Sequence, residues 1–117
     1  MTLQNNIVDA EEYHQRAMNV AERAFTKKLR RGGEVEPLFQ EAFELERHAA
    51  QLISAELEFE PSRSVLHRSA AALALQCGEI RAAEQLICTA LAGNPPEEIA
   101  DELRDLLAEV LEKLRRV

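Results

Sequence analysis

Apolar residues recur at helical spacing along most of the 117-residue chain, and the pattern is clearest near its end. Between residues 99 and 114 they fall three or four positions apart, with charged residues at the positions between them. That spacing places apolar side chains on one face of an α-helix and charged ones on the other. The apolar members are Ile99, Leu103, Leu106, Leu107, Val110, Leu111 and Leu114. We therefore predict that residues 95–115 form a terminal helix with one buried face.

The same periodicity predicts four earlier helices, separated by residues that favour turns. Their expected ranges are 8–30, 34–57, 63–76 and 79–92. Residues 70–75 are all apolar, which is typical of a helix enclosed by other helices. The chain is therefore predicted to be all-α, with the helix over 63–76 at its centre.

Short polar side chains mark the expected starts of three of these helices. Asp9, followed by Glu12, has the spacing of a capping box for the first helix. Ser62 is the expected N-cap of the third helix. Asn94 is the expected N-cap of the fifth helix, with Pro95 in the first helical position.

One hairpin carries a more specific pattern around Gly78. A glycine there can adopt the left-handed conformation that ends one helix and leads into the next. Small residues at matched positions on both helices allow the pair to pack closely. The residues that carry the pattern are Ala70, Ala71, Gly78, Ala83, Ala90 and Pro95. Over its 34 residues, the segment 64–97 resembles a tetratricopeptide repeat (TPR).

Internal repetition extends the resemblance towards the N-terminus. A shift of 34 residues aligns 47–61 with 81–95 and gives seven identities. The match stops upstream, where Glu44 falls opposite Gly78, and the turn of the first hairpin is expected at Gly32-Gly33. We predict one domain over 1–117, a TPR-like stack of antiparallel helical hairpins. It comprises an elongated hairpin over 8–58, a TPR-like hairpin over 62–93 and a C-terminal capping helix over 95–115. Whether the second helix breaks near Glu44 is left open.

The resemblance implies a groove that binds a peptide or protein, without catalysis and without a cofactor. By position, the groove side of the third helix would be Val65, Arg68, Ala72, Leu75 and Gln76. Arg68 would be the charged residue of the groove that anchors the partner. A stack this short is also compatible with a homodimer, for which Val65 and Phe39 are candidate contacts.

Arg63 and His67 lie one helical turn apart and could form a polar patch with Ser62 and Arg68. Such a patch could bind an acidic peptide or a phosphate. The alternative is a structural role, with this first helical turn bonded to carboxylates such as those of Glu58 or Glu60. We include Arg63 and His67 among the candidate partner-binding residues.

The charge of the chain bears on the class of partner. The formal net charge is −7, which disfavours binding to nucleic acid because phosphate contacts need a basic surface. A basic cluster over residues 27–31 leaves a nucleic-acid-associated regulator as a minor alternative. The cluster also suits the C-terminal end of a helix, where cations are favoured.

The sequence also bears on location. No apolar run is long enough to cross a membrane, and the N-terminus lacks the features of a signal peptide. We expect a cytoplasmic protein in which Cys77 and Cys88 are reduced, buried thiols.

A different class of function is suggested by Glu11 and His14, which have the spacing of a metal-ligand pair on a helix. The alternative function is therefore a small helical-bundle metal-binding protein or enzyme. No second pair of this kind accompanies it in the sequence, so neither a metal site nor a catalytic residue is assigned.

Overall fold

The computed structural model describes residues 3–53 and 55–116, with side chains from residue 6 onwards. It confirms the all-α prediction: the described residues form helices and turns, without strands. The elements are α1 (Leu3–Leu29), α2 (Glu36–Gln51), a short 3₁₀ helix η1 (Leu57–Phe59), α3 (Ser62–Gln76), α4 (Ile80–Leu91) and α5 (Glu97–Arg115).

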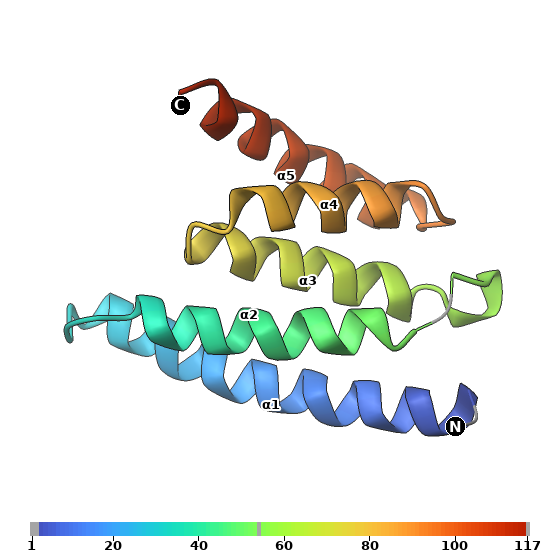
Figure 1. Cartoon of the computed structure of the whole chain (residues 1–117), viewed down its shortest axis with the longest axis horizontal. Coiled ribbons are helices and arrows are strands. Elements are labelled where there is room, and N and C mark those ends of the chain that lie inside the picture. Colours follow the sequence, from blue (N-terminus) through green and yellow to red (C-terminus); the bar gives the residue numbers. More distant parts are fainter. Residues whose placement is uncertain (1–2, 54, 117) are drawn as a thin grey trace.

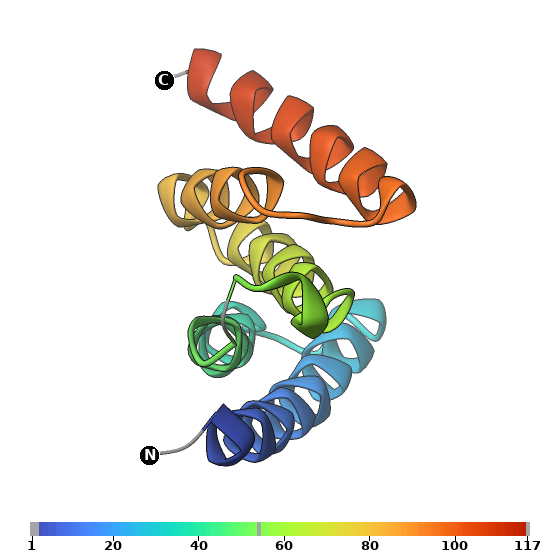
Figure 2. The same ribbon diagram turned by 90° about the vertical axis from the view of Figure 1, so that its right-hand side faces the viewer.

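The five α-helices pack in the order in which they occur along the chain (Figure 1). Successive helices run in opposite directions, so α1 with α2 and α3 with α4 form two hairpins, and α5 follows them. In the side view α2 and α4 lie to the left of α3 (Figure 2). Because α5 contacts α3 as well as α4, one face of α3 looks towards α5.

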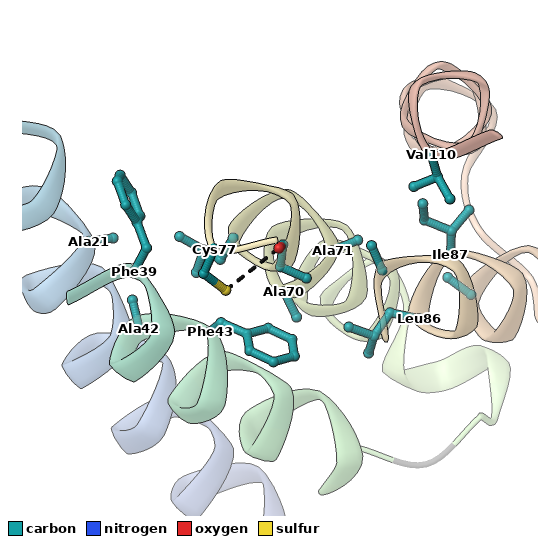
Figure 3. Close-up of a cluster of buried hydrophobic side chains, with 14 of the residues drawn as sticks. Ala21, Phe39, Ala42, Phe43, Ala70, Ala71, Cys77, Leu86, Ile87 and Val110 are labelled. Carbon is teal, nitrogen blue, oxygen red and sulfur yellow. Dashed lines mark hydrogen bonds between the residues drawn. The ribbon is translucent and has the colours of Figure 1, made fainter. Parts of the chain in front are cut away.

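The core lies on both sides of α3, as its apolar sequence predicts. Phe39 and Phe43 of α2 and Ile87 of α4 are at most 1% exposed, and the side chains of α3 lie between them (Figure 3). Ala70, Ala71 and Ala74 of α3 are fully buried. Small residues at these positions let neighbouring helices approach closely. Phe39 is therefore part of the core, and its predicted role as a dimer contact is wrong.

The turn at Gly78 forms as expected. Gly78 has a φ of 79°, in the left-handed region. The Glu79 N–H donates to the carbonyl oxygen of Ala74 (2.9 Å), which is the long bond of a Schellman motif. Glycine at this position avoids the steric cost that a side chain would carry.

The same motif ends α1, but a different residue takes the left-handed position. The Gly32 N–H donates to the carbonyl oxygen of Lys27 (2.9 Å), and the Arg31 N–H donates to that of Lys28 (3.2 Å). Arg31 has a φ of 51°, and Gly33 a φ of 100°. The turn lies where Gly32-Gly33 predicts it, yet an arginine holds the position that usually belongs to glycine.

Two helices have ends that differ from the prediction. The first begins at Leu3, so Asp9 lies inside it and not at its start. Ala10 is 1% exposed and packs with Ala49, Ala50 and Leu66, and this packing stabilises the early turns. The second helix ends at Gln51 and not at residue 57, and Leu57 is 70% exposed. That helix continues past Glu44 without a break.

The predicted N-caps Ser62 and Asn94 are also corrected. Ser62 is the first residue of α3, and the carboxylate of Glu60 takes the capping role. Its Oε1 accepts the backbone N–H (3.1 Å) and the hydroxyl (2.7 Å) of Ser64. At α5, neither Asn94 nor Pro96 provides a side-chain cap, and the carbonyl oxygen of Pro96 accepts the Ala100 N–H (2.9 Å).

Candidate functional site

One face of α3 lies between α1 and α5 and carries most of the predicted groove residues. Val65, Arg68, Ala72 and Gln76 recur every three or four positions, so they share one side of the helix. Val65, Arg68 and Ala72 are half-buried, and Gln76 is exposed. Two depressions flank this stripe, one towards α1 and one towards α5. We call this surface the α1/α3/α5 face.

The depression between α1 and α3 has a volume of about 200 Å³ and is the more enclosed of the two. Its walls are mostly apolar, with Glu11 and His14 at the α1 side. The lining residues are Ile7, Ala10, Glu11, His14, Ile53, Ser62, Val65 and Leu66. Val65, a predicted groove residue, lines this depression, and the sequence gives no indication that Glu11 and His14 stand opposite it.

The depression between α3 and α5 has a volume of about 380 Å³ and a negatively charged rim. Arg68 Nη1 donates to the Glu102 carboxylate (2.9 Å), so its charge is balanced within the protein. Asp105 and Glu109 line the same depression, and Ala72 contributes apolar surface. The predicted anchor therefore stands among carboxylates, which changes the expected chemistry of a partner.

The other two predicted groove residues lie outside the depressions. Gln76 Oε1 accepts a hydrogen bond from Lys28 Nζ (2.9 Å), so Gln76 connects α3 to the end of α1. Leu75 is half-buried and packs against the core.

Arg63 and His67 prove to be buried, each with 5% of its surface exposed. Arg63 Nη2 donates to the carbonyl oxygen of Thr89 in α4 (3.2 Å), and its Nη1 lies 4.0 Å from the Glu60 carboxylate. The His67 Nδ1–H donates to the carbonyl oxygen of Arg63 (2.8 Å). Burial lowers the pKa of His67, because the charged imidazolium is poorly solvated there. The predicted surface patch is thus corrected to a buried group that joins α3 to α4, and Glu60 is its acidic member.

A buried carboxylate that the sequence analysis missed lies behind the α1/α3/α5 face. Glu46 of α2 is fully buried, and the His14 Nδ1–H donates to its two oxygens (2.8 and 2.9 Å). Burial raises the pKa of Glu46, and hydrogen bonds from His14 and Ser69 partly oppose the rise. Glu46 occupies a position where the periodicity of α2 predicts an apolar residue. A charged residue at that position is the feature of the sequence that could have identified the buried carboxylate.

The metal alternative rests on Glu11 and His14, and the structure directs His14 to Glu46. Over residues 3–53 and 55–116, no group of three or more His, Cys, Asp or Glu side chains is placed to hold a metal ion. Cys77 is buried, and burial raises the pKa of its thiol. Cys88 is exposed, which corrects the prediction that both thiols are buried.

The basic cluster over residues 27–31 forms the exposed end of α1 and the turn that follows it. Lys28 bonds to Gln76 and lies over the ring of Phe39, so part of the cluster packs within the protein. None of the described helices is both long and apolar enough to cross a membrane.

Comparison of the chain with protein-family models, with curated proteins and with solved structures gives no match.

Proposed function

We propose that the chain is a non-catalytic, TPR-like protein-interaction module that binds a peptide or protein partner on its α1/α3/α5 face. The observation that carries the proposal is the pair of depressions on either side of α3, with Val65 in one and Arg68 and Ala72 in the other. A helical hairpin stack suits this role because its helices present an extended surface to a partner.

The charges of the face indicate the chemistry of the partner. Arg68 is paired with Glu102, and Asp105 and Glu109 leave the α3/α5 depression with an excess of negative charge. A segment that carries Lys or Arg is therefore favoured over the acidic partner that Arg68 alone suggests. The apolar walls of the α1/α3 depression would accept an apolar side chain of the same segment.

An affinity pull-down from native lysate, read by mass spectrometry, tests the proposal. Two opposite charge reversals are compared with wild type: Asp105→Lys and Arg68→Glu. Glu41→Lys is the matched control, because Glu41 is exposed on α2 and lies outside both depressions. We expect Asp105→Lys to lose the partner, and Arg68→Glu and Glu41→Lys to retain it.

The opposite result for the two reversals would identify an acidic partner and overturn the assignment of a basic one. If neither charge reversal changes the set of captured proteins, the α1/α3/α5 face is not the binding surface. Both variants are expected to stay folded. Asp105 is exposed, and a solvent-accessible ion pair such as Arg68–Glu102 contributes only about 0–1 kcal/mol. Circular dichroism and thermal melting check this expectation.

A further inference from the structure

The C-terminal half of α5 has an apolar edge that its neighbours cover only in part. α5 packs mainly against α4 and α3, and Leu103 and Val110 are fully buried in that contact. On the adjoining side of the same helix, Leu111 is 45% exposed, and Leu107 and Leu114 are half-buried. Towards its C-terminal end α5 rises away from α4 (Figure 1). Leu107 and Leu114 also pack against the core, so Leu111 is the exposed member of a partly covered apolar stripe. Apolar surface of this kind, bordered by charged residues, suits an interaction surface.

The architecture indicates what would cover this edge. Each earlier pair of helices is an antiparallel hairpin, α1 with α2 and α3 with α4. α5 stands in the position of the first helix of a third hairpin. An antiparallel helix laid along its exposed edge would continue the stack, and it would bury Leu107 and Leu111.

We propose that the α5 helix of a second copy of this chain occupies that position, in an antiparallel homodimer with two-fold symmetry. Symmetric dimers with one self-complementary patch are the commonest oligomers of soluble proteins. The α5 edge meets the requirement of self-complementarity in both its apolar residues and its charges.

The charge along α5 changes sign from one end to the other. Its first turn carries Glu97 and Glu98, and its last turn carries Lys113 and Arg115. In an antiparallel pair the acidic first turn of each helix lies towards the basic last turn of the other, whereas a parallel pair would bring turns of like charge together. Charge complementarity therefore selects the antiparallel arrangement.

Residue spacing places the two-fold axis near Ala108. Asp101, Ala108 and Arg115 are seven residues apart, so they lie along one edge of the helix. All three are exposed. Asp101 accepts a hydrogen bond from Arg104 Nη1 of its own helix (2.8 Å). With the axis at Ala108, Asp101 of one copy would in addition face Arg115 of the other, and the small side chain of Ala108 would permit close approach.

This surface is separate from the α3/α5 depression, because Glu102 and Glu109 lie on the opposite edge of α5 from Leu111. The inference therefore does not depend on the proposed function. A groove variant that loses its partner and still dimerises would show that the two surfaces act independently.

Sedimentation equilibrium of the whole chain, over a wide concentration range and at low and high salt, tests the dimer. We expect wild type to dimerise with micromolar affinity, since one helix pair gives an interface at the small end of the usual range. Leu111→Arg should weaken the dimer by about tenfold or more, which corresponds to about 1.4 kcal/mol. Leu29→Arg is the matched control, because Leu29 is 85% exposed on α1, and α1 and α5 lie at opposite ends of the helix stack (Figure 1).

A charge exchange tests the direction of the helices. Asp101→Arg and Arg115→Asp should each weaken the dimer, and the two together should restore it. A wild-type chain that is monomeric at every concentration would overturn the proposal. A dimer that Leu111→Arg leaves intact would also overturn it. A dimer that Leu29→Arg weakens as much as Leu111→Arg does would overturn it too. If the double reversal is as weak as the single ones, the antiparallel pairing of these residues is wrong.

Discussion

The guanidinium group of Arg63 lies directly against the backbone of Gly93, in the turn that leads from α4 to α5. A Cβ atom added at position 93 would overlap Arg63 Nη1. Arg63 also donates to the carbonyl oxygen of Thr89 near the end of α4 (3.2 Å). The first turn of α3 is thereby joined to the last turn of α4, and a side chain at position 93 would have to displace the Arg63 guanidinium group.

The first prediction concerns this contact. Gly93→Ala should lower the free energy of unfolding by about 1–3 kcal/mol, because the buried Arg63 side chain has little room to move away from the added methyl group. Urea denaturation measures the change. Gly32→Ala is the control, because its Cβ would meet the flexible side chain of Lys27, and we expect a change of less than about 0.5 kcal/mol. Equal stability of the two variants would show that Arg63 is not fixed against Gly93.

The helices themselves could be predicted from the sequence because apolar periodicity is a local property. The all-α class and the central place of α3 followed from it, and the turn at Gly78 followed from the conformational freedom of glycine. Several helix ends could not be predicted in this way. Ser62 and Glu60 both fit a helix start, and only the folded chain shows that Glu60 bonds to Ser64.

The candidate site was predictable to a smaller extent, because it depends on contacts between distant residues. The spacing of Val65, Arg68 and Ala72 places them on one side of α3, where they line the two depressions. The sequence could not show that Arg68 meets Glu102, 34 residues away, or that α4 buries Arg63. An exposed polar residue is interpreted as a binding residue, and a buried one as a structural residue. Which of the two applies depends on burial, which is a property of the tertiary structure.

A second prediction follows from the conformation of Arg31. Its φ of 51° is disfavoured for a residue with a side chain, and glycine adopts it freely. Arg31→Gly should therefore raise the free energy of unfolding by about 0.5–1 kcal/mol. Chemical denaturation measures the shift.

The matched control is Arg30→Gly. It removes the same charge one residue earlier, where φ is not positive. There the added backbone freedom should lower stability. An equal response of both variants would mean that lost charge repulsion, and not backbone conformation, determines the effect.

The third prediction concerns pH and the buried Glu46. Burial raises the pKa of Glu46 above the ordinary value of 4.5, so the folded protein binds its proton more tightly than the unfolded chain does. Its protonation therefore favours folding. This contribution is fully present below about pH 4.5 and declines as the pH rises through the raised pKa.

Glu46→Gln keeps the shape of the side chain but stays uncharged at every pH, so it lacks this decline. We expect the stability of Glu46→Gln relative to wild type to increase as the pH is raised from 4.5 towards neutrality. Urea denaturation at a series of pH values measures the difference. Glu44→Gln, on the exposed side of the same helix, is the control for removing a carboxylate at the surface. If the difference for Glu46→Gln is flat, or no steeper than that for Glu44→Gln, the hydrogen bonds from His14 and Ser69 fully offset the cost of burying the carboxylate.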